Sequence, residues 1–200
     1  MIIDRWKLKI FMIKIISFSP AVTKKIGAAI ARQISNHSGL SQGPVFVLLE
    51  GNLGAGKTTF TLGFLQYFGI KPAAASPTFV IAKRYETRRR GKACPVVKLI
   101  STTGGERGKY NSRLKTEKLD SLTTSHQSQV TVSNIWHIDA YRLKSKKDLE
   151  LIGFTEIKKQ PHMVVIMEWP GNVNGMKLKN VIRVRFEHGT SASERVIIIR

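Results

Sequence analysis

The sequence contains a single cysteine, few acidic residues and no long apolar run. Because Cys94 is that one cysteine among 200 residues, the chain can form neither an internal disulfide nor a cysteine-based metal cluster. This usage favours a reducing compartment, and we expect the cytoplasm. No apolar run approaches the ~20 residues that a transmembrane helix requires. Lys14 interrupts the apolar stretch near the N-terminus, so we expect neither a membrane span nor a secretory signal.

Basic residues far outnumber acidic ones. The chain has 33 Lys and Arg against 13 Asp and Glu, which gives a formal net charge of +20. A charge of this sign favours polyanionic partners, RNA first and anionic membrane surfaces second. The alternative is that the charge lies in solvated segments that attract no particular partner.

The basic excess includes a long stretch in the middle of the chain. Residues 84–134 hold eleven Lys and Arg against four acids, and Ser, Thr and Gly dominate the remainder. Apart from residues 96–100 the stretch shows no sustained apolar pattern, which predicts a basic, flexible insertion at about 87–134. Direct RNA contact by this insertion is one interpretation. Tyr110 is the only aromatic residue between positions 86 and 135, which favours a solvated loop instead.

The length and apolar content predict one domain. With 200 residues and 42% hydrophobic composition, the chain can bury one core but is too short for two sizeable ones. We expect residues 13–200 to form this domain, interrupted by the insertion, with residues 1–12 as an N-terminal extension. Met1 and Met12 are both possible natural starts.

The order of apolar segments predicts an α/β fold, with a mostly parallel sheet flanked by helices. Residues 45–49 are continuously apolar, which is typical of a strand buried on both faces. The two C-terminal strands are separated by turn-forming residues and are predicted to form an antiparallel hairpin at one sheet edge. The predicted strands are 13–17, 45–49, 79–85, 135–139, 163–167, 181–186 and 195–200, and the predicted helices are 21–34, 57–68 and 146–153.

Residues 51–58, Gly-Asn-Leu-Gly-Ala-Gly-Lys-Thr, match the P-loop (Walker A) pattern G-x-x-x-x-G-K-[ST] between a strand and a helix. The glycines let successive backbone N–H groups point at phosphate oxygens, and the helix directs its positive end to the same place. We expect Lys57 to neutralise the β- and γ-phosphates and Thr58 to bind Mg²⁺. No N/T-K-x-D motif for guanine is present, so ATP is the expected nucleotide. The other residues predicted to bind it are Gly51, Gly54, Ala55, Gly56 and Thr59.

Two acids are candidates for completing the metal site. Asp139 and Glu168 each follow an apolar strand, and open α/β sheets place their ligand crevices at the carboxyl ends of strands. The sequence leaves open which of the two holds the metal directly.

Five segments together resemble the TsaE family, also known as the YjeE family, in their order and style. The resemblance covers most of the chain outside residues 1–12 and the insertion. Single motifs are weak, but five in series are specific. The segments are GNLGAGKTTFTLGFLQYFGI (51–70), SPTFVIAKRYE (76–86), WHIDAYRL (136–143), DLELIGFTE (148–156) and VVIMEWPGNV (164–173).

The resemblance implies a P-loop NTPase-like fold and weak Mg²⁺-dependent ATPase activity. It also implies action with TsaD-like and TsaB-like proteins, which together install the threonylcarbamoyl group on adenosine 37 of ANN-decoding tRNAs. Thr58 and Glu168 match the family's Mg²⁺ positions, and Lys57 matches its phosphate lysine.

Three further residues have matches in the family. Thr78, in Ser76-Pro77-Thr78, matches a switch-like loop in which its hydroxyl could sense the γ-phosphate. Asp139 matches an acidic residue that is a candidate for orienting metal-bound or attacking water. Trp169 matches an aromatic residue expected near the nucleotide.

Some features depart from the family. Asn52 stands where Asp is usual, Ala140 replaces Leu, and the basic insertion is about three times longer than usual. Two other functions remain open on the residues alone. One is a P-loop kinase of a small molecule, and the other is a nucleotide-switched binding module with incidental hydrolysis.

Overall fold

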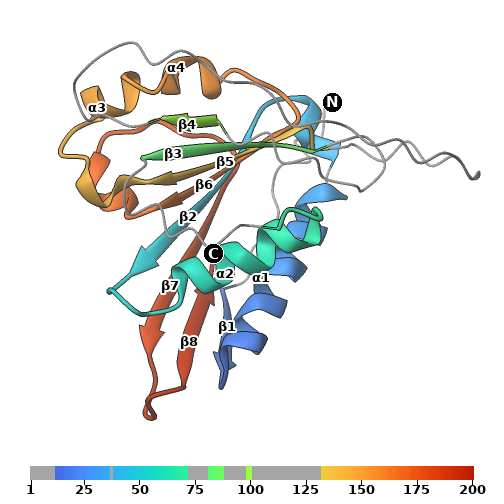
Figure 1. Cartoon of the computed structure of the whole chain (residues 1–200), viewed down its shortest axis with the longest axis vertical. Coiled ribbons are helices and arrows are strands. Elements are labelled where there is room, and N and C mark those ends of the chain that lie inside the picture. The colour runs from blue at the N-terminus through green and yellow to red at the C-terminus, as the bar shows by residue number, and fades with distance from the viewer. Residues whose placement is uncertain (1–11, 37, 72–80, 88–97, 101–131) are drawn as a thin grey trace, which may run out of the picture.

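The computed structural model describes residues 12–36, 38–71, 81–87, 98–100 and 132–200 (Figure 1). Within them the chain forms an eight-stranded sheet in the order β1-β8-β7-β2-β6-β5-β3-β4. The strands are β1 (Ile13–Ser17), β2 (Val45–Gly51), β3 (Ala82–Glu86), β4 (Lys98–Ile100), β5 (Asn134–Asp139), β6 (Met163–Glu168), β7 (Val181–His188) and β8 (Arg195–Ile199). The helices are α1 (Pro20–Ser35), α2 (Lys57–Tyr67), α3 (Lys146–Glu150) and α4 (Phe154–Ile157), with 3-10 turns η1 (Ser38–Ser41), η2 (Ala140–Arg142) and η3 (Pro170–Val173).

The centre of the sheet is parallel and both of its sides are antiparallel. β7, β2, β6 and β5 run in the same direction, whereas the pairs β7–β8, β8–β1, β5–β3 and β3–β4 are antiparallel. The predicted α/β fold with a sheet flanked by helices is confirmed, with the parallel strands confined to the centre. The short β7–β8 connection permits only antiparallel pairing, because parallel strands need a long crossover.

The C-terminal hairpin does not form the edge of the sheet. β7 and β8 pair as predicted, but β1 lies outside β8, with Ser17 opposite Arg195. Ile15 of β1 packs against the core beneath α1, and the hydroxyl groups of Ser17 and Thr23 are 2.8 Å apart. The prediction that the hairpin forms the edge of the sheet is therefore wrong. The apolar pattern of residues 13–17 predicts a strand there but does not specify which strand it pairs with.

Part of the predicted insertion belongs to the sheet. β4, at residues 98–100, pairs antiparallel with β3 at the opposite edge from β1. The rest of that prediction, including its flexibility and RNA contact, concerns mainly residues 88–97 and 101–131, which lie outside the described residues. Residues 1–11 lie outside them as well.

Helices cover both faces of the sheet. α1 and α2 pack on one face, over a core that includes Val47, Leu49 and Phe64, while α3 and α4 cover the other through residues such as Phe154 (Figure 1). Alternating residues of β2 enter both cores, with Phe46 on the second face, so this strand is buried on both sides as predicted. β2 therefore holds the glycine-rich loop that follows it in a fixed position.

Candidate nucleotide-binding site

The loop between β2 and α2 adopts the backbone conformation that its glycines predict. Gly51, Gly54 and Gly56 have φ angles of 140°, 73° and 106°, a region that side chains disfavour. A Cβ on Gly51 would also lie 2.4 Å from the Phe186 carbonyl oxygen. Glycine at position 51 is therefore required both by the local backbone angle and by the close approach of β7.

The N-terminus of α2 opens onto this loop. Gly56 is the N-cap residue, and it provides no side-chain cap hydrogen bond. The Phe60 amide donates to the Gly56 carbonyl at 2.9 Å, so the first intrahelical bond leaves the preceding N–H groups without an acceptor inside the helix. Such an N-terminus is suited to an anion, because the N–H groups and the helix dipole act together.

Lys57 lies in this loop with its ammonium group enclosed. Its side chain is only 5% exposed, and Nζ donates to the carbonyls of Gly51 at 2.7 Å and Asn52 at 2.8 Å. Burial lowers the pKa of the Lys57 ammonium, and the charges of Glu168 and Asp139 offset part of that effect. The ammonium group is thus held beside the loop by two uncharged carbonyl acceptors, which charged phosphate oxygens could replace.

Asp139 and Glu168 come together because β5 and β6 are neighbouring parallel strands. The two residues are register partners, so their side chains lie on the same face of the sheet, the face that α2 covers. Both line a cavity of about 340 Å³ whose walls also include Lys57 and Thr58. The full lining is Leu53, Gly54, Gly56, Lys57, Thr58, Thr59, Asp139, Tyr141, Arg142, Glu168 and Trp169.

The two carboxylates have different surroundings. Glu168 is 4% exposed and its Oε1 lies 2.9 Å from Nε2 of His137, which is buried as well. Asp139 accepts a hydrogen bond from the Tyr141 amide at 3.0 Å. Burial raises the pKa of the Asp139 carboxyl; the bond from Tyr141 lowers it, and the charge of Glu168 raises it further.

These residues fit a magnesium ion accompanied by a nucleotide. Carboxylate and hydroxyl oxygens are the ligands that Mg²⁺ prefers, and it usually takes only one or two carboxylates together with phosphates and water. Thr58, Asp139 and Glu168 supply this set. Among the described residues, no group of three His, Cys, Asp or Glu could hold a metal by itself.

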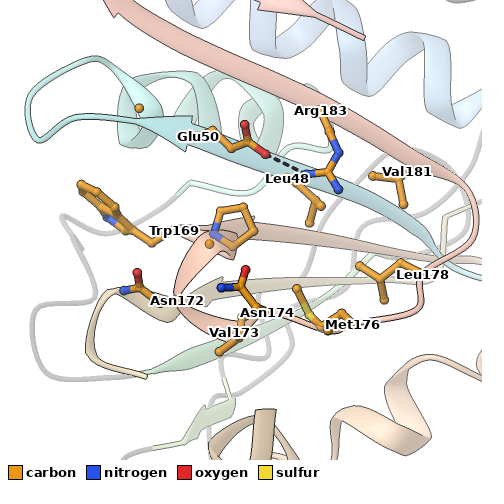
Figure 2. A pocket seen from close by; sticks show the side chains of 14 residues that line it. Leu48, Glu50, Trp169, Asn172, Val173, Asn174, Met176, Leu178, Val181 and Arg183 are labelled. Atoms are coloured by element: carbon orange, nitrogen blue, oxygen red, sulfur yellow. Dashed lines mark hydrogen bonds and ion pairs between the residues drawn. The ribbon is translucent and has the colours of Figure 1, made fainter. Parts of the chain in front are cut away.

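Trp169 separates this cavity from a second one. Its backbone is left-handed, with φ 57° and ψ 47°, and its ring lies 4.0 Å from Lys57 Nζ and packs against Tyr141. The second cavity, of about 520 Å³, lies between η3 with its following loop and the strands β2 and β7 (Figure 2). Its wall carries an ion pair of 2.7 Å between Glu50 and Arg183. Trp169 is the one residue that the linings of these two cavities share, so its side chain forms part of the wall of each.

Most of the predicted site residues meet at the first cavity. Two of the described ones do not line it: Gly51 lines the second cavity, and Ala55 is buried with its amide bonded to the Asn52 carbonyl at 3.2 Å. Thr78 lies outside the described residues, so its predicted switch role stays a prediction.

The sequence analysis missed three polar residues. His137 bonds Glu168, Arg142 lines the cavity, and Arg195 donates to the Gly54 carbonyl at 3.2 Å from across the sheet. A signal existed for His137, because it lies two residues before Asp139 and so faces the same side of the strand. None existed for Arg195, which is 141 residues away from Gly54.

No helix in the described part of the chain is long and apolar enough to cross a membrane.

Comparison with known proteins places the chain in a family. A family model described as "Threonylcarbamoyl adenosine biosynthesis protein TsaE" matches residues 18–98 and 116–197. The tRNA threonylcarbamoyladenosine biosynthesis protein TsaE of Rickettsia conorii is 25% identical over 166 residues, which cover 82% of this chain and 65% of that protein. The protein of the same name from Bacillus subtilis is 62% identical over 37 residues, or 18% of this chain and 23% of that protein.

These matches span less than two thirds of either relative's own length. The crystal structure of Bacillus subtilis YdiB matches with a TM-score of 0.53 and 20% identity, over 94% of this chain and 84% of that one, which supports the fold. Because the family model covers most of the sequence on both sides of a short gap, the chain belongs to the TsaE family of threonylcarbamoyl adenosine biosynthesis proteins.

Proposed function

We propose that this chain is a weak, partner-dependent ATPase that binds Mg·ATP in the cavity at residues 51–58. In this proposal it acts with TsaD-like and TsaB-like proteins, in the cytoplasm, to form the threonylcarbamoyl group on adenosine 37 of ANN-decoding tRNAs. The observation that carries the nucleotide site is the meeting of Lys57, Thr58, Asp139 and Glu168 around one cavity. The name of the matched family supports the pathway.

The proposed roles follow from the position of each side chain. Thr58 and Glu168 would hold Mg²⁺, which would neutralise charge on the β- and γ-phosphates when bound. Lys57 would exchange its carbonyl acceptors, Gly51 and Asn52, for phosphate oxygens, which are stronger acceptors because they are charged. Asp139, which lines the cavity and is less buried than Glu168, would orient a water molecule there.

Dependence on partners is supported by the exposure of the cavity rim. The Leu53 side chain is 83% exposed and Tyr141 is 61% exposed, although both line the cavity. Water-excluding closure strengthens electrostatic catalysis in a P-loop site. A partner that covers this rim would supply that closure, and turnover by the chain alone should accordingly be slow.

The test is nucleotide binding and turnover by the purified chain. We expect binding of ATP in the presence of Mg²⁺ and release of phosphate to water, with turnover rising when TsaD-like and TsaB-like proteins are added. Lys57→Met should weaken nucleotide binding at least tenfold, because a charged hydrogen bond to phosphate contributes roughly 1.5–3 kcal/mol. Lys25→Met, on the exposed side of α1, is the matched control and should bind normally.

Absence of nucleotide binding by the folded protein, alone and with its partners, would refute the proposal. Phosphoryl transfer to a small-molecule hydroxyl instead of water would identify a kinase. Tight binding whose turnover the partners leave unchanged would favour a nucleotide-switched binding module.

A further inference from the structure

His137 is a buried polar side chain that the proposed mechanism does not use. It lies on β5, two residues before Asp139, and its side chain lies on the same face of the sheet. Both His137, at 3% exposure, and Glu168, at 4%, are shielded from water. The 2.9 Å contact between Nε2 and Oε1 is therefore a hydrogen bond with little competition from solvent.

The direction of this bond follows from the chemistry of its partners. In the role of a metal ligand Glu168 is ionised and has no hydrogen to donate, so in that role Nε2 of His137 carries the hydrogen and Glu168 Oε1 accepts it. A carboxylate held through one oxygen is fixed in rotation about its terminal bond. Its second oxygen then has one orientation, determined by an imidazole that is itself packed in the core.

Packing alone does not account for a histidine at this position. His137 stands in a strand whose other core-facing residue on this side is Ile135, and an aliphatic side chain would fill a buried site without a polar group to satisfy. The bond to Glu168 satisfies one imidazole nitrogen and partly compensates the burial of the carboxylate. The hydrogen bond stabilises both buried groups. A histidine at this position is therefore explained if Glu168 has a role that requires its charge.

We propose that His137 is a positioning residue, which orients the Glu168 carboxylate so that its other oxygen meets the divalent ion bound with the nucleotide. The proposal rests on the proposed function, in which Glu168 is a magnesium ligand. Outer groups that orient metal ligands typically contribute 10–100-fold to metal affinity. Such outer groups have little effect on the binding of nucleotide atoms that the metal does not touch. Loss of His137 should therefore weaken metal binding and leave metal-free nucleotide binding unchanged.

The experiment measures the two ligands separately on the full chain. ADP affinity is measured in EDTA, and Mn²⁺ affinity of the ADP complex is measured by the paramagnetic resonance signal of free Mn²⁺. We expect His137→Leu to leave ADP affinity in EDTA within about twofold of wild type and to lower Mn²⁺ affinity 10–100-fold. His137→Gln, whose terminal amide can donate from a similar distance, should recover most of that loss.

Two controls separate orientation from general damage. Phe154→Leu, in the core on the opposite face of the sheet, lowers stability without touching the site and should leave Mn²⁺ affinity unchanged. In a Glu168→Gln background, His137→Leu should have little further effect on Mn²⁺, because the residue that it orients is no longer a charged ligand.

Each outcome decides the matter. Equal Mn²⁺ affinity in wild type and His137→Leu, or an equal further loss in the Glu168→Gln background, would overturn the positioning role while leaving the proposed function intact. Failure of the wild type to bind ADP at all would overturn both. Should His137→Leu not fold, His137→Gln and His137→Asn carry the test, because only the longer amide has the reach to donate to Glu168. Equal Mn²⁺ affinity of those two variants would then count against the proposal.

Discussion

The close packing of α1 against α2 gives a prediction that links the fold to the site. The two helices approach through glycines, and a Cβ built on Gly63 of α2 would lie 2.0 Å from the carbonyl oxygen of Lys24 and 2.5 Å from its Cα. Gly27 of α1 makes the reciprocal approach, 2.2 Å from the Phe60 carbonyl oxygen. Both obstacles are backbone atoms, which cannot rotate away. Gly63→Ala therefore requires the helices to move apart.

The expected size of the effect follows from these distances. Ordinary van der Waals contact begins at 3.4 Å, so the shortfall at Gly63 is about 1.4 Å. One additional methyl group in a well-packed interior typically costs ~1–3 kcal/mol, whereas Gly→Ala within a helix gains ~1 kcal/mol in helix propensity. Since backbone cannot yield as a side chain does, the cost should lie at the upper end. We expect a net loss of ~1–2 kcal/mol in the free energy of unfolding.

Urea unfolding measures this loss as a lower midpoint with an unchanged slope. Gln66→Ala, on the exposed side of the same helix, is the control and should change the midpoint little. Gly63→Ala should also weaken ADP binding, because α2 begins with Lys57 and Thr58. A variant at least as stable as the wild type would show that the two helices are not confined by this contact, and the reasoning would fail.

Three further predictions test other parts of the structure. Asp139→Asn should raise stability at pH 7 by ~0.5–2 kcal/mol, the range common for stabilising substitutions, while lowering ATP turnover. Burial raises the Asp139 pKa in the folded state, so ionisation of Asp139 opposes folding at any pH above its pKa in the unfolded chain. The stability gain of Asp139→Asn should therefore vanish at acidic pH, where Asp139 is protonated in both states. A gain that does not depend on pH would contradict burial of the charge as its cause. Arg195→Ala should weaken ADP binding, because it removes the hydrogen bond to the Gly54 carbonyl, and should change the thermal midpoint little. Normal ADP affinity would show that this hydrogen bond does not hold the loop in its binding conformation. Phe154→Ala should cost ~3–5 kcal/mol, seen by calorimetry, because it empties a fully buried site under α4; a loss below 1 kcal/mol would contradict that packing.

Local patterns in the sequence predicted most elements, although the helix predicted at 146–153 ends at Glu150 and the elements α4 and β4 were not predicted. The strand at 13–17 matches β1, and the helix predicted to begin at Lys57 begins there. The loop at 51–58 has the conformation that its glycines require. Each of these features depends on residues within about ten positions, over which periodicity and backbone preferences act directly.

Pairing across the sheet could be predicted only in part. The prediction that Asp139 and Glu168 each lie at the carboxyl end of an apolar strand follows from a general rule of α/β sheets, and it is confirmed. That these two strands are neighbours, with the two acids as register partners, was not predicted. The outer position of β1 and the tether from Arg195 to Gly54 depend on contacts between distant segments. A strand's own apolar pattern carries no information about which edge it joins, so these features needed the structure.

The arrangement of charges around Lys57 suggests why a folded chain keeps such a costly site. Lys57 and Glu168 are buried in the wall of one cavity, and Asp139 beside them is partly removed from water. Burial lowers the pKa of Lys57 and raises the pKa of Asp139. Each group would be more stable in water, and apolar residues of similar size would often stabilise the fold more. Their partners compensate only in part, since Lys57 has two carbonyls and an indole ring and Glu168 has one imidazole. What would complete the compensation is a ligand with phosphate oxygens for the ammonium and a cation for the carboxylates, which is the chemistry of a magnesium nucleotide.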